Sequence, residues 1–310
     1  MQRPAKPFTP VRFRIQPPKK TIMRPKIIAE IGCNHKGDIS TAIEMIDVAA
    51  DFCKVDAVKF QKRNNKELLT EDQYNSPHPV LENSYGKTYG EHREFLEFSV
   101  DEHKFLKEYC EKKNIIYSTS VWDLTSTKEI CSLNPNFIKI PSATNLNFAI
   151  HDFLCKNYDG QIQISTGMTS KEEINQIINF YSKQNRSKDL LIYACTSGYP
   201  VDFEDVCLLE INYLMENYLD QVGEVGFSGH HLGIAVDIAA VTIGAKWIER
   251  HFTLDRTWKG TDHAASLEPE GLRKLCRDIK NVYSALTYKN KEVLEVEEIQ
   301  RKKLKWIPQK

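Results

Sequence analysis

Short apolar runs rich in β-branched residues alternate with amphipathic stretches along most of this chain. Strands that alternate with helices predict a parallel sheet, because each helical crossover returns the chain to the same edge. We expect strands at 26–31, 57–60, 115–118, 137–140, 161–164, 190–193, 224–227 and 247–252. We expect helices at about 41–53, 99–113, 124–132, 148–157, 170–184, 204–217, 232–244 and 269–286.

Eight such units in succession favour a closed α/β barrel of the (β/α)8 type, the TIM barrel, over an open doubly wound sheet. An open sheet would usually carry a glycine-rich first turn, and the segment GCNHKG at 32–37 does not fit the G-x-G-x-x-G pattern. A chain of 310 residues is long enough to bury a core of this size. We therefore predict a single barrel domain over 26–286.

Three segments lie outside this repeat. Residues 1–25 are rich in proline and basic residues, and we expect them to cap the bottom of the barrel as a hairpin, with a flexible basic tail as the alternative. Residues 62–98 form a long loop after the second strand, and loops of that length in compact domains usually serve function. Residues 287–310 are charged and are expected to form a tail that is helical in part.

Composition excludes several classes of protein. The 42 Lys and Arg balance 42 Asp and Glu, which gives no reason to expect nucleic acid or an anionic membrane as a partner. None of the eight cysteines forms a C-x-x-C pair, which indicates buried thiols of a reducing compartment. No apolar run reaches the ~18 residues of a membrane span, and the start lacks a signal-peptide core. We expect a soluble protein of the cytoplasm.

Polar residues end almost every predicted strand. The active-site residues of TIM barrels lie at the carboxyl ends of the strands. The burial of many polar groups there costs free energy, and the packing of a barrel gives no reason for it. These strand-end residues are Glu30, Asn34, His35, Lys59, Gln61, Ser118, Thr119, Ser120, Lys139, Ser142, Thr144, Ser165, Thr166, Thr196, Ser197, Tyr199, Ser228, His230, His231, Glu249, Arg250 and His251.

Two lysines lie within apolar predicted strands. Lys59 and Lys139 must either point into the barrel or extend outward between helices. Together with the hydroxyl groups of Ser142, Ser165 and Ser228, they suit an anion that carries a phosphate and a carboxylate. A lysine that forms a Schiff base is the competing interpretation.

Two histidines end adjacent predicted strands at the same edge. His230 and His251, with a nearby carboxylate, could bind Mn²⁺, Mg²⁺ or Zn²⁺. A site with few protein ligands leaves coordination positions for a substrate oxygen. His231 is the alternative first ligand, and one member of the adjacent pair should face away. Three further histidines in polar loops are either substrate contacts or solvated: His35, His92 and His263.

Eight segments follow one another from Ile27 to about Pro269: IIAEIGCNHKGD, AVKFQK, YGKTYGEHREFLEFS, IKIPSATN, STGM, CTSGYP, GFSGHH and GAKWIERHFTLDRTWKGTDHAASLEP. In content and order they resemble the sialic acid synthase family, which condenses phosphoenolpyruvate with N-acetylmannosamine or its 6-phosphate. The segments GKTYGEH and TWKGTDH look most like the animal-type synthases.

The resemblance implies roles for individual residues. His230 and His251 match the two metal-binding histidines, which implies Mn²⁺ or Mg²⁺ as cofactor, and Glu30 matches the acidic residue beside the reacting centre. The positions that match contacts to phosphoenolpyruvate are Lys59, Lys139, Ser142, Ser165, Ser197 and Ser228. The positions that match contacts to the amino sugar are Gln61, Tyr199 and Asp262. A homodimer is a further implication.

The chain departs from the family in two places. Thr144 stands where members usually have a carboxylate that acts on the sugar or in proton transfer. Many members end with an antifreeze-like domain that reaches into the partner subunit's site, but only about 40 residues follow Pro269. We expect that domain to be absent and its arginine to be replaced, dispensed with or supplied by another protein. Lys87 and Arg93 are interpreted as solvated charges, with contact to a sugar phosphate as the alternative.

The expected reaction is an aldol-like condensation that gives a nine-carbon sugar acid and phosphate. Three alternatives remain. The enzyme could use a different aldehyde, as a synthase of legionaminic or pseudaminic type. The barrel could bind a sugar phosphate without turnover. A class I lysine aldolase is the third.

Overall fold

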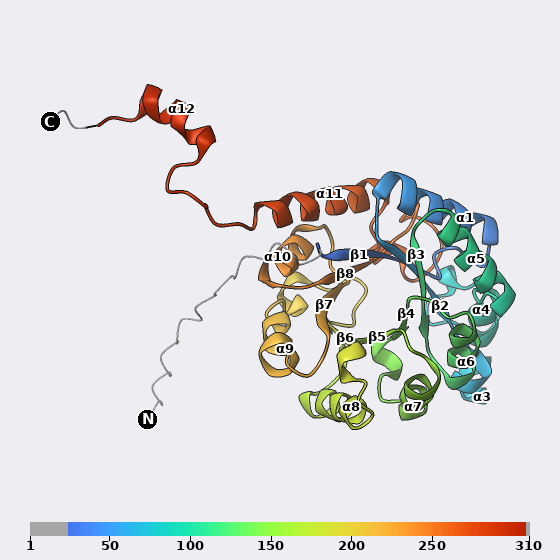
Figure 1. Cartoon of the computed structure of the whole chain (residues 1–310). Helices are drawn as coiled ribbons and strands as arrows, with labels where there is room; N and C mark the ends of the chain where they lie inside the picture. The colour runs from blue at the N-terminus through green and yellow to red at the C-terminus, as the bar shows by residue number, and fades with distance from the viewer. Residues whose placement is uncertain (1–23, 308–310) are drawn as a thin grey trace, which may run out of the picture.

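The computed structural model describes residues 24–307, and within them eight parallel strands close a barrel in sequence order (Figure 1). This confirms the predicted (β/α)8 fold. The strands are β1 (Lys26–Gly32), β2 (Ala57–Lys62), β3 (Ile116–Val121), β4 (Phe137–Ile140), β5 (Gln161–Ser165), β6 (Leu190–Cys195), β7 (Glu224–Gly229) and β8 (Trp247–His251).

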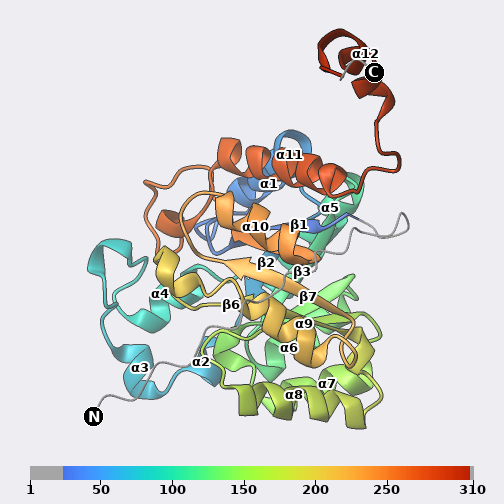
Figure 2. The same ribbon diagram turned by 90° about the vertical axis from the view of Figure 1, so that its left-hand side faces the viewer.

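Helices surround the barrel, except for the last one, α12 (Figures 1 and 2). The helices are α1 (Ile39–Asp47), α2 (Asn65–Leu68), α3 (Glu71–Asn75), α4 (Tyr89–Phe95), α5 (Val100–Lys112), α6 (Leu124–Ser132), α7 (Phe148–Asn157), α8 (Lys171–Lys183), α9 (Glu210–Tyr218), α10 (Ala235–Ile243), α11 (Pro269–Ala285) and α12 (Glu295–Leu304).

Two regions differ from the sequence-based expectation. The helix expected at 204–217 is divided into a 3-10 turn, Phe203–Val206, and α9, because Cys207 between them adopts the left-handed conformation at φ 50°. The loop expected at 62–98 folds in part into the three short helices α2, α3 and α4. Two of them begin with capping boxes, at Thr70 for α3 and Thr88 for α4, which satisfies free backbone N–H groups at these helix starts.

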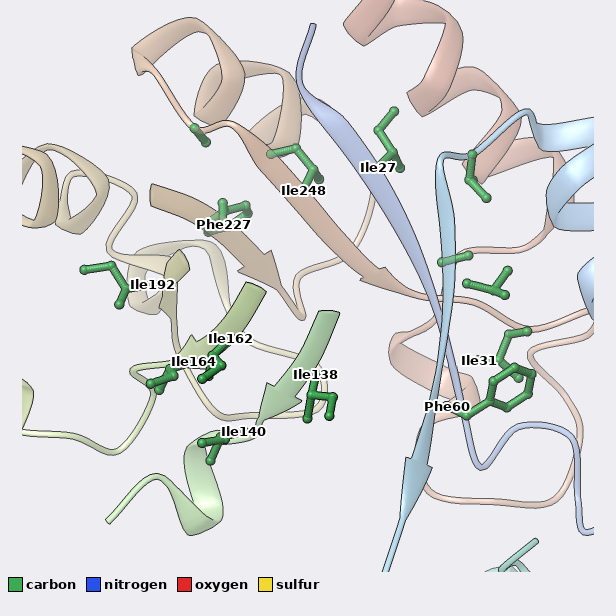
Figure 3. Close-up of a cluster of buried hydrophobic side chains, with 14 of the residues drawn as sticks. Ile27, Ile31, Phe60, Ile138, Ile140, Ile162, Ile164, Ile192, Phe227 and Ile248 are labelled. Carbon is green, nitrogen blue, oxygen red and sulfur yellow. The ribbon is translucent and has the colours of Figure 1, made fainter. Parts of the chain in front are cut away.

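The alternation of side chains along each strand separates two apolar regions. The larger core lies between strands and helices and includes Ile27 of β1, Phe60 of β2 and Ile248 of β8 (Figure 3). A smaller cluster fills the barrel itself and includes Ile28, Phe137 and Trp247. Since successive side chains of a strand point to opposite faces, the polar residues that follow Ile28, Phe137 and Trp247 at a spacing of two also face inward.

The strand register brings these inward-facing residues to one level. Glu30 of β1 pairs with Lys59 of β2 on one side and with His251 of β8 on the other. Ser120 of β3 pairs with Lys139 of β4. Residues from opposite parts of the sequence therefore meet at the carboxyl end of the barrel, where the site is expected.

Two predicted segments flank the barrel domain. The predicted cap at 1–25 lies almost wholly outside the described residues and stays a prediction. The tail at 287–310 contains α12, as expected, and Figures 1 and 2 both show this helix standing away from the barrel. Between residues 24 and 307, no helix has both the length and the apolar character needed to cross a membrane.

The eight cysteines are all free thiols, as the sequence indicates. Their predicted burial is only partly correct, because Cys53 and Cys110 are buried whereas Cys207 is exposed.

Candidate active site

A cavity of about 280 Å³ opens at the carboxyl ends of the strands, and it is called the first cavity below. It gathers most of the predicted site residues. Those in its lining are Glu30, Lys59, Gln61, Lys139, Ser142, Ser165, Ser197, Tyr199, Ser228, His230 and His251.

Two buried lysines form the floor of the first cavity. Lys59 and Lys139 are 2% and 3% exposed, so both point into the barrel and neither extends outward between helices. Lys59 forms an ion pair with Glu30 and donates a hydrogen bond of 2.6 Å to Ser120. Lys139 forms an ion pair of 2.5 Å with Glu249. The floor is therefore a connected network in which Lys59 also lies 3.8 Å from Glu249.

Burial and neighbouring opposite charges shift the pKa values of the groups in this network in opposite directions. Burial would raise the pKa of Glu249, but the cations of Lys139 and Lys59 outweigh it and hold that pKa at about 2. Burial raises the pKa of Glu30, against the opposing effect of Lys59. Burial lowers the pKa of Lys139, against the attraction of Glu249. The two carboxylates thus have pKa values moved in opposite directions, a pattern that is frequent where one group must stay charged and another must exchange protons.

Hydroxyl groups line the wall above the lysines. Ser228 donates a hydrogen bond of 3.2 Å to Glu249, and the buried Oγ of Ser165 has no hydrogen-bond partner among the described residues. Ser142 and Ser197 converge beside Gly167, since a Cβ there would lie 2.8 Å and 2.4 Å from their Oγ atoms. A side chain at 167 would have to displace both hydroxyls, and glycine leaves room for them.

The two predicted metal-binding histidines face each other across one rim of the cavity. The ring centroids of His230 and His251 are 5.4 Å apart. Nδ1 of His230 lies 2.8 Å from the carbonyl oxygen of Thr196, which can only accept, so Nδ1 carries the proton and Nε2 is left with a free lone pair. Burial and the neighbouring His251 lower the pKa of His230 to about 3, which keeps the ring neutral.

These residues fit a divalent metal. Nδ1 of His251 is buried without a hydrogen-bond partner among the described residues and lies 3.9 Å from Asp262. No group of three or more His, Cys, Asp or Glu side chains within residues 24–307 is arranged to hold a metal. The imidazoles of His230 and His251 are thus the two candidate protein ligands, and they leave several coordination positions for substrate and water.

His231 is excluded as the alternative ligand. It is fully buried on the other side of the strand, where its Nε2 lies 3.1 Å from Arg250 and 3.3 Å from Asp237. One member of the adjacent pair therefore faces away, as predicted.

A second cavity, of about 170 Å³, adjoins the first one. Gln61, Trp122, Tyr199 and His251 belong to the lining of both. Asp262, predicted as a sugar contact, lines the second cavity, beside His251. Burial would raise the pKa of Asp262, but the neighbouring His251 outweighs it and lowers that pKa.

The structure bears on several weaker expectations. Thr144 lies in a 3-10 turn, Ser142–Thr144, and belongs to the lining of neither cavity, so its contact with the sugar stays a prediction. The loop histidines His35, His92 and His263 are buried, so the solvated interpretation is wrong for all three. Arg93, interpreted as a solvated charge, lines the second cavity, whereas Lys87 is exposed.

Some site residues had no assigned role from sequence. Glu249, Ser120, Trp122 and Cys195 all line the first cavity. Glu249 could have been found from the alternation of β8, because it lies between the inward-facing Trp247 and His251. Trp122 follows β3 in a loop, where no periodicity indicates its direction.

Comparison with known proteins shows related sequences over most of the chain. Residues 45–291 match the model of the NeuB family. The chain is 40% identical over 276 residues to N-acetylneuraminate-9-phosphate synthase of Homo sapiens, a match that covers 87% of this chain and 74% of that protein. It is 34% identical over 270 residues to N,N'-diacetyllegionaminic acid synthase of Campylobacter jejuni, with 86% and 78% covered.

A solved structure has the same architecture. The sialic acid synthetase of Leptospira borgpetersenii, crystallised with citrate, superposes with a TM-score of 0.76 at 28% sequence identity. The superposition covers 93% of this chain and 96% of that one.

Proposed function

This chain belongs to the NeuB family, the family of the sialic acid synthases, and we propose that it condenses phosphoenolpyruvate with N-acetylmannosamine or its 6-phosphate. The products are a sialic acid, or its 9-phosphate, and inorganic phosphate. The observation that carries this proposal is that one cavity has two buried lysines on its floor and two facing histidines on its rim.

Phosphoenolpyruvate occupies the lysine side of the cavity. Lys59 and Lys139 provide the cations that its phosphate and carboxylate require, and Ser142, Ser165 and Ser197 provide hydroxyl donors. The unpartnered Oγ of Ser165 supports this assignment, because a buried polar group without a partner is costly unless a ligand satisfies it.

The sugar occupies the histidine side. Mn²⁺ or Mg²⁺ held by His230 and His251 would supply Lewis acidity to the aldehyde oxygen of the sugar. Gln61, Tyr199 and Asp262 orient the sugar so that its aldehyde carbon faces C3 of phosphoenolpyruvate. Gln61 is itself positioned by a hydrogen bond of 3.0 Å from its Nε2 to Glu30.

The reaction forms one carbon–carbon bond, and at C2 it replaces the carbon–oxygen bond to phosphate with one to the oxygen of water. The electron pair of the C2–C3 double bond attacks the aldehyde carbon, the aldehyde oxygen takes up a proton and becomes a hydroxyl, and water adds at the electron-poor C2. Glu30, which is buried beside both substrates, orients that water and accepts a proton from it. The resulting C2 adduct expels phosphate, which leaves the keto group of a nine-carbon acid.

The test is an assay with a panel of sugars. The protein is incubated with Mn²⁺, phosphoenolpyruvate and either N-acetylmannosamine, mannose or one of their 6-phosphates, and phosphate and 2-keto acid are measured. We expect both products with at least one sugar. If no sugar supports release of both, the proposal is wrong.

A synthase of another nonulosonic acid is the second candidate, and the 34% identity to the Campylobacter legionaminic acid synthase favours it. The corresponding diacetylated aldehyde sugar, added to the same panel, distinguishes the two. Calorimetric binding of a sugar without turnover would indicate the non-catalytic barrel. Trapping with borohydride and pyruvate would reveal a lysine aldolase. The homodimer and the cytoplasmic location stay predictions.

A further inference from the structure

The two candidate metal ligands are held in place in different ways. The paired register of β7 and β8 ends with Gly229 opposite Arg250. His230 and His251 are the next residues on the two segments, so they lie just beyond the last pair of this ladder. His251 still pairs with Glu30 of β1, whereas His230 begins the turn that leads to α10. The separation of the two imidazoles therefore depends on what fixes this turn.

The loop after β6 anchors both the backbone and the ring of His230. The carbonyl oxygen of His230 accepts a hydrogen bond of 3.1 Å from the backbone N–H of Val201. Its Nδ1 donates one of 2.8 Å to the carbonyl oxygen of Thr196. These two contacts fix His230 relative to β6, but they do not fix it relative to β8, which carries His251.

Arg250 connects the turn to β8. Its side chain is 1% exposed and lies on the opposite face of the strand from that of His251, because successive side chains of a strand alternate. Its Nη2 donates a hydrogen bond of 2.5 Å to the carbonyl oxygen of His231, and its Nη1 donates one of 2.8 Å to that of Gly233. The planar guanidinium group thus holds the backbone of the turn at two points, which the single nitrogen of a lysine cannot reproduce.

Asp237 fixes the orientation of this guanidinium group. Its carboxylate lies in the first turn of α10, is fully buried and accepts a hydrogen bond of 2.5 Å from Nη1 of Arg250. Nε of Arg250 and Oδ1 of Asp237 are buried without a hydrogen-bond partner among the described residues. A buried ion pair is often no more stabilising than apolar residues of the same size, so stability alone does not account for this one.

We propose that Arg250 is a positioning residue for metal binding, which holds the turn after His230 against β8 and so keeps the imidazoles of His230 and His251 at their separation of 5.4 Å. This inference rests on the proposed function, in which these two histidines bind Mn²⁺ or Mg²⁺. Arg250 belongs to the lining of neither cavity, so it acts through the turn and not on a substrate. Its contacts to the turn include two backbone carbonyls, so the side chain of His231 can change without releasing the turn.

The experiment titrates Mn²⁺ alone into the full chain and measures its Kd by calorimetry, for the wild type and for two variants of the buried pair. Arg250→Lys keeps the charge that pairs with Asp237 but loses the contact through two nitrogen atoms. The double variant Arg250→Met with Asp237→Asn removes both charges, so neither is left buried without its partner. Arg277→Lys is the matched control, because it changes an exposed arginine of α11 that pairs with Asp278.

We expect the Kd for Mn²⁺ to rise about tenfold to a hundredfold in both Arg250 variants, the usual effect of losing a residue that orients metal ligands, and to stay unchanged in Arg277→Lys. The Kd for phosphoenolpyruvate, measured with a chelator present, should stay unchanged throughout, because Lys59 and Lys139 lie on β2 and β4. Unchanged Mn²⁺ affinity in both Arg250 variants, or an equal loss of affinity for both ligands, would overturn the role of Arg250 and leave the proposed function intact.

If the wild type binds no Mn²⁺, the metal site of the proposed function fails, and hydrogen exchange decides whether Arg250 holds the turn. The backbone amides of residues 230–238, which cover the turn and the start of α10, should then exchange faster in both Arg250 variants than in the wild type and in Arg277→Lys. Equal exchange in all four proteins would refute the positioning role independently.

Discussion

Lys139 and Glu249, which are 110 residues apart in the chain, form a buried ion pair in which 2.5 Å separates Nζ from Oε1. Lys139 belongs to β4 and Glu249 to β8, so the pair spans the interior of the barrel. Glu249 also accepts a hydrogen bond from Ser228. This carboxylate therefore fixes one of the two lysines that are proposed to bind phosphoenolpyruvate.

Removal of the Glu249 carboxylate should destabilise the folded protein. We expect Glu249→Gln to lower the free energy of unfolding by about 3 kcal/mol, because it leaves a buried cation without its partner. Denaturant unfolding measures the change. Glu270→Gln is the control, since it breaks an exposed pair of 2.7 Å with Arg273 and should leave stability unchanged. Equal effects of the two substitutions would contradict a structural role for the buried pair.

Lys59 and Lys62 provide a second matched comparison, because both lie on β2 and only Lys59 faces the first cavity. Lys62 instead lies 3.4 Å from Glu129. We expect Lys59→Gln to raise KM for phosphoenolpyruvate about tenfold or more through loss of a charge-assisted contact. Lys62→Gln should leave KM unchanged. Steady-state kinetics in phosphoenolpyruvate would refute the anion site if both variants behaved alike.

Metal content tests the histidine pair directly. We expect His230→Ala and His251→Ala each to lose bound Mn²⁺, because either substitution removes half of the available protein ligands. His231→Gln should retain the metal, since His231 faces Arg250 on the opposite side of the strand and glutamine can still accept from that guanidinium. Elemental analysis after dialysis reports the stoichiometry. Full metal content in the two alanine variants would exclude the assignment.

Acid should weaken the start of α1. Asp38 accepts hydrogen bonds from the backbone N–H groups of Ser40 and Thr41, and bonds from the hydroxyls of Thr41 and Ser40 lower its pKa from an ordinary 3.8 to about 2. Its folded pKa is below its unfolded one, so its contribution is present above about pH 4 and is lost as the pH falls through about 2.

We therefore expect Asp38→Ala to cost about 0.5 to 1 kcal/mol at neutral pH, in the lower part of the range for helix caps because the residue is exposed. The difference from the wild type should shrink toward pH 2. Thermal unfolding across this range checks the sign, and a difference that grew in acid would contradict it.

Much of the barrel and its first cavity could be predicted from local sequence. Ile28 and Glu30 are two residues apart and share the inward face of β1, as Phe137 and Lys139 do on β4. Along each strand the apolar residue therefore lies low in the barrel and the charged residue lies at its mouth. Most strands extend one to three residues beyond their predicted ends, because the polar site residues there interrupt the apolar runs that mark a strand.

The second cavity could not be predicted in the same way. It depends on the loop before α4 meeting the loop after β8, where Tyr85 donates a hydrogen bond to the carbonyl of Lys259. That contact joins segments 174 residues apart, and neither segment has a periodicity that indicates which side chains turn inward. The sequence alone therefore predicts a solvated charge at Arg93.

The most direct test of the condensation uses phosphoenolpyruvate labelled with ¹⁸O at the oxygen that bridges C2 and phosphorus. After incubation with Mn²⁺ and the sugar that the panel selects, mass spectrometry should find a nine-carbon 2-keto acid and an equal amount of phosphate that carries the label. Water that adds at C2 leaves the bridging oxygen on phosphorus. Unlabelled phosphate, or phosphate without the acid, would contradict the proposed reaction.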